Sequence, residues 1–347
     1  MTAPLCIFVG SASAFNVRRL VDNLGAMLAD ARPLHLVATG PVDDGVRTYY
    51  DVFGTARADS RVGGARALHR YLRGHDPAAV VQVTRPPTHG SLVGGVCRHH
   101  GVRSVYRYSG DRFYEYRVAS GYSRGTAFLL GNVVNRLAVR FCDRYVALGP
   151  NGKSRLVAHG VDERDVEILP PTIDPTPFER DREPPAPVRS DGPVGLFVGR
   201  LTRLKGARTL ERTLPAVFDA REGFDLVVVG DRDRPLDLPE RYASRVRYVG
   251  TVDPGAVPAY MQAADVLVHP SLTEGVPRVV LESLAAGTPV VARDVGDVAS
   301  VTDNVFTGDR EFVDLVARPE VLTLDDVEPF TRDALAPRYV SYFDRVA

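Results

Sequence analysis

Short apolar segments alternate with segments of helical length along most of this 347-residue chain. The first apolar segment runs from Leu5 to Gly10, and the residues after it repeat apolar side chains at the three- and four-residue spacing of an amphipathic helix. The alternation resumes after residue 193 with VGLFVG. Strands that alternate with helices predict parallel sheets covered by helices on both faces. We therefore expect an α/β fold.

A proline-rich, charged stretch without periodicity separates the two alternating blocks and predicts a linker. A chain of this length has room for two domains, each with its own core. We expect two Rossmann-like, doubly wound domains that face each other across a cleft. The expected boundaries are 1–175 for the N-terminal domain, 176–193 for the linker and 194–332 for the C-terminal domain.

The composition limits the class of protein. No apolar run approaches the ~18 residues of a membrane span, and the first residues lack the basic start of a signal peptide. The three cysteines (Cys6, Cys97 and Cys142) are scattered, which suits a reducing compartment, and they show no metal-ligand spacing. We expect a cytoplasmic protein, with no bound metal and no nucleic-acid partner.

The net charge of zero hides an asymmetry between the two halves. Residues 1–178 contain 22 Lys and Arg against 15 Asp and Glu, whereas residues 179–347 contain 21 against 28. A basic half fits an anionic partner, such as a phosphate-linked acceptor or peripheral contact with the inner face of a membrane. An ordinary solvated surface explains the imbalance equally well.

The stretch from Pro270 to Ala292 combines a polar loop, a short helix and an apolar strand. Its helix is expected from Pro277 to Ala286, because proline suits a first helical turn and Gly287 followed by a proline suits a helix end. The amides around this helix start form an anion site. These amides belong to Gly275, Val276 and Arg278.

Two glutamates, Glu274 and Glu282, flank this anion site eight residues apart. Carboxylates repel phosphate, so their place beside it makes sense if they accept hydrogen bonds from hydroxyls next to the phosphate. A nucleotide-sugar has that arrangement of a diphosphate between a ribose and a sugar. Taken alone, the stretch is equally well explained as a surface loop and a buried βα unit.

Two cations in the same domain fit the anion site. Arg200 ends a predicted strand, and Lys205 lies five residues further on, just before a helix. A guanidinium binds phosphate oxygens with two parallel hydrogen bonds, and an ammonium adds a compact charge. Together they are suited to hold a diphosphate and to stabilise the charge that it gains on leaving. Two cations in a loop are more often simply solvated.

The N-terminal half offers weaker candidates for ligand contacts. Gly10 ends the first strand, but the loop after it lacks the glycine pattern of a dinucleotide site. A loop rich in arginine and aromatic residues, 107–125, follows another strand and contains Ser109 and Asp111. Asp111 is suited to orient or deprotonate a hydroxyl. The apolar helix expected at 126–141 either lies on a membrane interface or packs on the core.

Several segments, in this order, resemble one enzyme family. VGRLTRLKG, VRYVGTV and YMQAADVLVHPSLTEGVPRVVLESLAAGTPVVA resemble the donor domain of retaining glycosyltransferases of the glycogen-synthase-like family 4, which have the GT-B fold. Residues 142–178 resemble the interdomain segment of that family. The resemblance also implies that the final helix, 333–347, packs back on the N-terminal domain and that domain closure completes the site.

The resemblance implies a role for each candidate in the C-terminal domain. Arg200 and Lys205 would hold the donor pyrophosphate, Glu274 would contact the transferred sugar, and Glu282 would bind the ribose hydroxyls. The main chain at Gly275, Val276 and Arg278 would complete the phosphate site. The family transfers a sugar from a nucleoside diphosphate with retention of configuration and without an obligatory metal or other cofactor. The lack of cysteines and histidines at metal-ligand spacing agrees with this.

Two positions depart from the family pattern. Where the family often has a histidine that contacts sugar and acceptor, this chain has Ser109, with Asp111 as a substitute. The usual Gly-Phe-Gly after the first glutamate is Gly275, Val276 and Pro277, and the proline removes one amide donor.

The expected function is transfer of a sugar from a nucleotide-sugar donor to a hydroxyl of a glycan or lipid-linked acceptor. Gly10 and Ser109 are further candidates for contacts with the donor. Two alternatives remain at this point. One is a non-catalytic subunit that binds a nucleotide-sugar or glycan. The other is a GT-B epimerase that acts on a sugar nucleotide.

Overall fold

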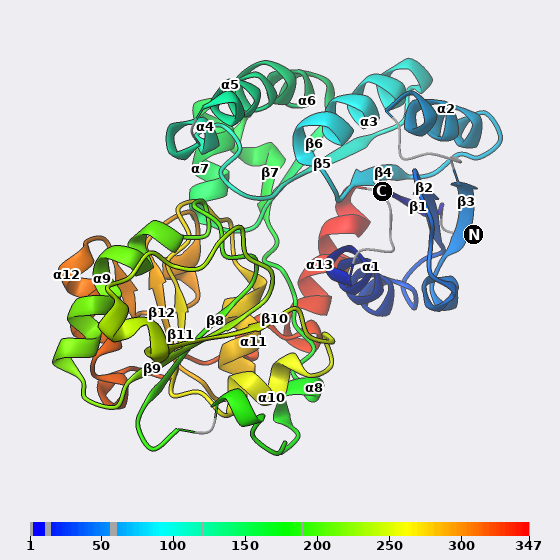
Figure 1. Ribbon diagram of the computed structural model, residues 1–347. Helices are drawn as coiled ribbons and strands as arrows, with labels where there is room; N and C mark the ends of the chain where they lie inside the picture. The colour runs from blue at the N-terminus through cyan, green and yellow to red at the C-terminus, as the bar shows by residue number, and fades with distance from the viewer. Residues whose placement is uncertain (1–2, 11–14, 56–60, 120, 189, 347) are drawn as a thin grey trace. The chain divides into compact units, whose positions relative to one another are not determined.

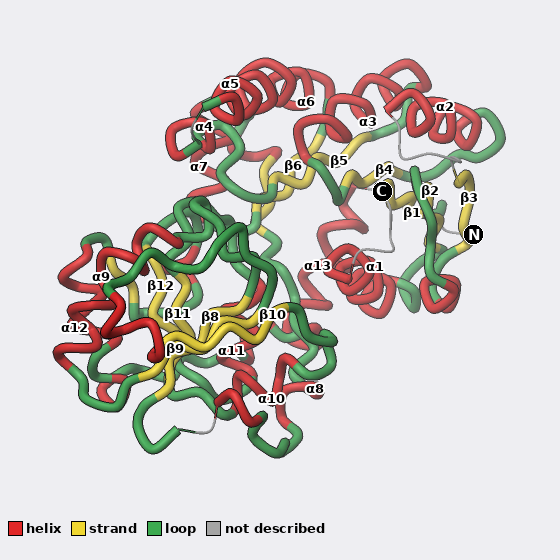
Figure 2. The backbone as a smooth tube through the Cα atoms, viewed as in Figure 1, coloured by secondary structure: helices red, strands yellow, loops and turns green. Residues whose placement is uncertain are grey.

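A computed structural model describes residues 3–10, 15–55, 61–119, 121–188 and 190–346. The chain divides into two compact units, residues 1–172 with 332–347 and residues 173–331. Each unit is built on a parallel sheet with helices on both faces (Figures 1 and 2). The prediction of two doubly wound α/β domains is therefore confirmed.

The first unit contains a seven-stranded sheet in the order β3-β2-β1-β4-β5-β6-β7. Every pairing in it is parallel, and in β1 Leu5 lies opposite Leu34 of β2 on one side and Ala79 of β4 on the other. The strands are β1 (Leu5–Val9), β2 (Leu34–Ala38), β3 (Asp51–Thr55), β4 (Ala79–Gln82), β5 (Ser104–Tyr108), β6 (Arg144–Ala147) and β7 (Val166–Ile168).

Helices cover both faces of this sheet because successive strand residues point to opposite sides. Leu5, Ile7 and Val9 pack with α1 and α13, whereas Cys6 and Phe8 pack with α2 and α3 (Figure 1). The helices are α1 (Phe15–Leu28), η1 (Asp44–Thr48), α2 (Arg61–Leu72), α3 (Pro86–His100), α4 (Glu115–Val118), α5 (Tyr122–Phe128), η2 (Leu129–Val134, π-helical), α6 (Asn135–Phe141), α7 (Pro150–Ala158), η3 (Glu163–Asp165) and α13 (Arg332–Val346).

Helix α13 returns to the first unit from the far end of the sequence. Its buried side chains join the same core as α1 and the strands. Polar contacts hold it as well: Tyr339 Oη donates to Pro170 O at 2.6 Å, and Arg103 Nη1 donates to Val346 O at 2.7 Å. The last helix is thus part of the core of the first unit.

The second unit contains a six-stranded parallel sheet in the order β10-β9-β8-β11-β12-β13. Helices α9 and α12 cover one face, and α10 and α11 cover the other (Figure 2). The elements are α8 (Thr176–Glu179), η4 (Ala186–Val188), β8 (Val194–Val198), α9 (Ala207–Ala220), β9 (Asp225–Val229), η5 (Glu240–Arg245), β10 (Val246–Gly250), α10 (Val257–Gln262), β11 (Val266–His269), α11 (Arg278–Ala285), β12 (Val290–Arg293), η6 (Val298–Ser300), β13 (Val305–Phe306), α12 (Asp309–Val316), η7 (Pro319–Val321) and η8 (Glu328–Phe330).

Three sequence-based expectations need correction. The expected linker, 176–193, belongs to the second unit: Phe178 is buried, and its carbonyl accepts a hydrogen bond from Gln262 Nε2 at 2.6 Å. The expected loop 107–125 contains α4 and the start of α5. The helix expected from Pro277 begins at Arg278, because Pro277 has the extended backbone of an N-cap residue.

In the part of the chain that the structure describes, no helix is both long and apolar enough to cross a membrane. Cys6, Cys97 and Cys142 are all free thiols in the core. Burial raises the pKa of each thiol well above its usual range, so these cysteines act as small apolar side chains.

Candidate active site

The second unit has a topological switch point between β8 and β11. From β8 the chain continues to β9 and β10, which lie on one side of β8 within the sheet. It then returns to β11, which lies on the other side of β8. In open α/β sheets, ligands bind beyond the carboxyl ends of the strands at such a point. The two loops that leave these strand ends, 199–206 and 270–277, contain most of the predicted donor-site residues.

These two loops are bound to each other. Leu272 N donates to Leu204 O at 2.8 Å, and Ser271 Oγ donates to the same carbonyl at 3.3 Å. Gly206 allows the close approach, because a Cβ at this position would lie 2.2 Å from the carbonyl oxygen of Pro270. Its φ of +92° also falls in the left-handed region that favours glycine. The loop after β8 (the β8 loop) is thus packed and hydrogen-bonded against the loop after β11 (the β11 loop).

Three ionisable side chains meet where the loops join. Lys205 Nζ lies 2.5 Å from Glu274 Oε1, and His269 Nε2 donates to the same oxygen at 3.1 Å. The side chains of Glu274 and His269 are 14% and 6% exposed, whereas that of Lys205 is 43% exposed. The Glu274 carboxylate therefore contacts a buried histidine and a lysine that is partly exposed to solvent.

The pKa of Glu274 reflects two opposing effects. Burial alone would raise it, because a carboxylate loses its hydration. The hydrogen bond from His269 and the charges of His269 and Lys205 outweigh burial and lower the pKa of Glu274 to about 2. Glu274 is consequently a carboxylate at neutral pH, with one oxygen engaged by both partners.

The other predicted residues of this domain lie in the same two loops and in α11. Arg200 follows β8 on the exposed side, and its Nε lies 3.7 Å from Asp231 Oδ2. Gly275 and Val276 lead into α11, with Gly275 O accepting from Asp297 N at 3.0 Å. The remaining two lie in α11, whose first residue is Arg278 and whose middle contains the half-buried Glu282.

The first unit has its own switch point, between β1 and β4. Gly10 follows β1, and its amide donates to Thr84 Oγ1, just beyond β4, at 2.8 Å. The same hydroxyl oxygen lies 3.1 Å from His89 Nδ1 in α3. Arg85, the residue before α3, adopts a left-handed backbone with φ of +48°, which is uncommon for a residue other than glycine. Gly10 thus links the chain after β1 to the chain after β4, the two strands that flank this switch point.

A cavity of about 640 Å³ opens at the start of α3. Its walls carry two arginines and a carboxylate beside apolar side chains. Arg112 Nη1 lies 2.8 Å from Glu115 Oε2, and Gly131 lets η2 approach the chain at Arg112, since a Cβ there would lie 2.1 Å from Arg112 O. The lining residues are Arg85, Pro86, Pro87, Thr88, His89, Arg112, Glu115, Ser123, Thr126, Ala127, Leu130 and Gly131.

Ser109 and Asp111 lie just beyond β5 and are not among the lining residues of this cavity. Asp111 Oδ2 is 3.4 Å from Arg155 Nη2, and Ser109 O accepts from Arg112 Nε at 3.1 Å. Burial raises the pKa of Asp111, although the charge of Arg155 opposes this effect. Asp111 therefore contacts Arg155 of α7, and Ser109 supports the arginine that lines the cavity.

The sequence analysis does not identify two of the functional candidates, His269 and Arg85. His269 follows the apolar run VLV, and Arg85 lies in the segment TRPPTHG. A single polar residue at the carboxyl end of a switch-point strand is the signal that would have identified His269. For Arg85 the backbone conformation is the signal, and the sequence does not display it.

Comparison with known families points to the same unit. Residues 192–320 match the family model described as Glycosyl transferases group 1. The match lies wholly within the second unit and includes Arg200, Lys205, His269, Glu274 and Glu282.

Relatives and solved structures extend the comparison. The 2-deoxystreptamine glucosyltransferase of Streptomyces kanamyceticus is 30% identical over 229 residues, which are 60% of this chain and 58% of that protein. The chain therefore spans little more than half the length of this curated relative. The crystal structure of Anabaena HepE with UDP and glucose is 14% identical, with a TM-score of 0.71 over 99% of this chain and 100% of that one. This likeness shows the GT-B fold.

The GT-B fold is not limited to transferases. The UDP-GlcNAc 2-epimerase of Methanocaldococcus jannaschii superposes with a TM-score of 0.61 at 12% identity, covering 99% of each chain. The fold alone consequently does not separate transfer from epimerisation, and the chemistry of the site within residues 192–320 has to decide.

The lowered pKa of Glu274 predicts a component of acid stability. Its pKa in the folded chain, about 2, is below the ordinary 4.5, so folding gains stability that is complete above about pH 4.5 and is lost as the pH falls toward 2. At ~1.36 kcal/mol per pKa unit this contribution is at most about 3 kcal/mol. Between pH 6 and pH 3, the free energy of unfolding measured in urea should therefore fall less for Glu274→Gln than for the unmodified chain. Asp231→Asn, which changes an exposed carboxylate, is the control and should keep the full loss.

Proposed function

We propose that this chain is a glycosyltransferase that moves a sugar from a nucleoside-diphosphate sugar to an acceptor hydroxyl, with retention of configuration. One observation carries the proposal: Lys205, Glu274 and His269 meet at the switch point of a segment that matches group 1 glycosyltransferases. The crevice beyond such strand ends is where an α/β sheet binds its ligand. A cation and carboxylates held there have the chemistry to bind a diphosphate between two sugars.

In this proposal each side chain has a separate task. Lys205 and Arg200 bind the diphosphate and stabilise the charge that it gains on leaving. Glu274 accepts hydrogen bonds from hydroxyls of the transferred sugar through the carboxylate that His269 fixes, and Glu282 accepts them from the ribose. The positive end of α11 adds amide donors near the phosphates.

The transfer step balances without a further reactant. The acceptor oxygen forms a bond to the anomeric carbon as the bond from that carbon to the phosphate oxygen breaks. The nucleoside diphosphate leaves, and its released oxygen accepts the proton of the acceptor hydroxyl. Since the lysine and the arginine supply the positive charge at the diphosphate, we propose that the reaction needs no metal and no other cofactor.

A nucleotide-sugar screen tests the proposed function. Thermal-shift measurements with UDP-, GDP-, ADP- and TDP-sugars should identify one base, because a ligand that binds only the folded chain stabilises it. Incubation of that donor with and without acceptors, in the presence of EDTA, then separates the functions. A glycoside of unchanged anomeric configuration supports the proposal. Conversion of the donor without an acceptor would indicate an epimerase, binding without turnover would indicate a binding subunit, and no binding at all would overturn the donor site.

We further propose that the cavity of the first unit binds an anionic, lipid-linked acceptor. Arg85 and Arg112 line it, and a guanidinium binds phosphate oxygens with two parallel hydrogen bonds. Another wall is formed by α5 and η2, which continue into α6. These three elements also present apolar side chains to solvent, which suits a lipid tail at a membrane surface. They are Phe128, Leu129, Val133 and Leu137, all between 43% and 53% exposed.

Replacement of Arg112 tests this acceptor assignment. A hydrogen bond to a charged group contributes ~1.5–3 kcal/mol, so Arg112→Ala should raise the KM for a lipid-phosphate acceptor by about 10–100-fold. The thermal shift produced by the donor should stay unchanged. Arg47→Ala, an exposed arginine elsewhere in the first unit, is the matched control. An unchanged acceptor KM in Arg112→Ala, or equal effects in both variants, would place the acceptor elsewhere.

A further inference from the structure

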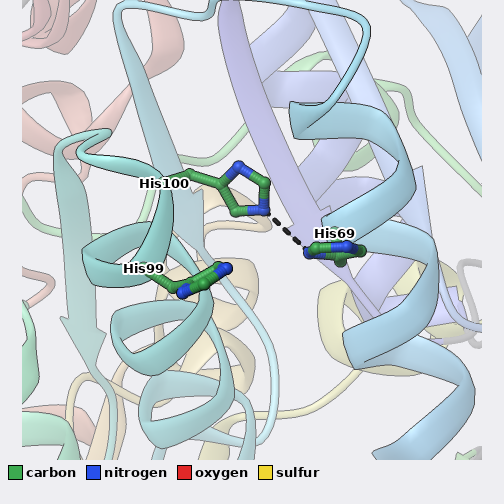
Figure 3. Close-up of side chains that lie close together, drawn as sticks. All are labelled: His69, His99 and His100. Atoms are coloured by element: carbon green, nitrogen blue, oxygen red, sulfur yellow. Dashed lines mark hydrogen bonds between the residues drawn. The ribbon is translucent and has the colours of Figure 1, made fainter.

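Three histidines from two helices gather at one place in the first unit (Figure 3). His69 comes from α2, and His99 and His100 come from the end of α3. His100 Nε2 lies 2.8 Å from His69 Nδ1, and one nitrogen from each of the three rings lies within 4.8 Å of the others. His69 and His99 are exposed, and His100 is half-buried. The sequence had predicted no cluster of this kind.

Both helices end at this cluster. His69 lies in the last turn of α2, and His99 and His100 are the last residues of α3, which Gly101 closes in a left-handed conformation. The carboxyl end of a helix carries a partial negative charge that favours a cation within its last turn. Since α2 packs against α3, the negative ends of two helices lie beside the three rings.

We propose that His69, His99 and His100 bind one Zn²⁺ ion. Imidazole nitrogens are common zinc ligands at ~2.0–2.1 Å, and tetrahedral geometry then sets them about 3.4 Å apart. Nitrogen atoms that lie within 4.8 Å of one another can reach this spacing by side-chain rotation. The ion replaces the proton that His69 and His100 now share, and water completes its coordination.

One cation acts on the cluster. Arg73 lies close enough to His100 to interact with it electrostatically. Its positive charge repels a metal ion bound by the three rings, so its removal should strengthen binding.

The position of the site in the fold separates it from catalysis. Helix α2 leads to the start of β4, and α3 leads to the start of β5, so both helices end at the amino edge of the parallel sheet. The cavity and Gly10 lie at the carboxyl edge. A zinc ion at the amino edge would join the ends of two neighbouring helices, and its effect should be on stability rather than on sugar transfer.

Isothermal titration of the untagged full chain with Zn²⁺ tests the site. We expect one ion per chain, with affinity at least about tenfold lower in His69→Asn, His99→Asn and His100→Asn, because even partners behind a metal ligand contribute about 10–100-fold. His75→Asn, a histidine outside the cluster, should bind as the unmodified chain does. Arg73→Gln should bind a few-fold more tightly, and Mg²⁺, which prefers oxygen ligands, should not bind here.

A second measurement separates the site from chance binding. Saturating Zn²⁺ should raise the melting temperature of the unmodified chain, reversibly with EDTA, and the three cluster variants should lose this shift. Zinc binding that survives all three substitutions together, or the same loss in His75→Asn, would overturn the proposal. These results do not depend on whether the chain transfers sugar.

Discussion

Lys205→Met is expected to lower kcat/KM for sugar transfer by about 100–1000-fold, the loss that follows removal of one group that stabilises charge in a transition state. Methionine keeps most of the length of the side chain but offers no charge to a leaving diphosphate. The substitution also removes one of the two partners of Glu274 Oε1. The measurement is steady-state kinetics with the donor found in the nucleotide-sugar screen.

The chain supplies a matched control for this substitution. Its only other lysine is Lys153, which pairs with Glu163 at 3.1 Å in the first unit. Lys153→Met should retain full activity. The same scarcity permits a chemical test, because donor binding should protect Lys205, but not Lys153, from acetylation. A Lys205→Met enzyme within threefold of the unmodified rate would remove the lysine from the proposed mechanism.

Gly206→Ala is expected to cost about 3 kcal/mol or more of the free energy of unfolding, among the largest effects of a single methyl group. The added Cβ would lie 2.2 Å from the carbonyl oxygen of Pro270, and the backbone has a φ of +92°. Any relief of this clash moves the β11 loop away from the β8 loop and so separates Glu274 from Lys205. Denaturant unfolding should report the first effect, and donor affinity should report the second.

Gly250→Ala separates the cost of the left-handed backbone from the cost of the clash between the two loops. Gly250 has a similar φ of +81°, but a Cβ there would meet nothing within 4 Å. This variant should therefore show only the cost of the left-handed backbone, which is about 1–3 kcal/mol, and should keep its donor affinity. Equal losses in the two variants would mean that contact between the loops contributes little.

Local pattern predicted much of this molecule. Alternation of strands and helices was enough to predict two doubly wound sheets, because each element has its own period. The anion site at the start of α11 and the joint role of Arg200 and Lys205 stay predictions, drawn from proline, glycine and cations near strand ends. The structure shows that Lys205 and Glu274, 69 residues apart, are in direct contact.

Contacts between distant segments could not be predicted from the sequence. Nothing in the order of residues shows that His269 turns toward Glu274, or that His69 lies beside His100. The helical segments within 107–125 were missed because glycine and charged residues there suggest a loop, whereas packing of Gly131 against Arg112 orders that region. In each case tertiary contacts, rather than local preference, decide the outcome.

The return of α13 to the first unit affects the order in which the two units can fold on the ribosome. The second unit, 173–331, is continuous in the sequence, whereas the core of the first unit includes Leu335, Tyr339 and Phe343. A domain usually folds once its own residues have been synthesised. The second unit can therefore be complete while the first, although it was begun earlier, still lacks one of its core helices.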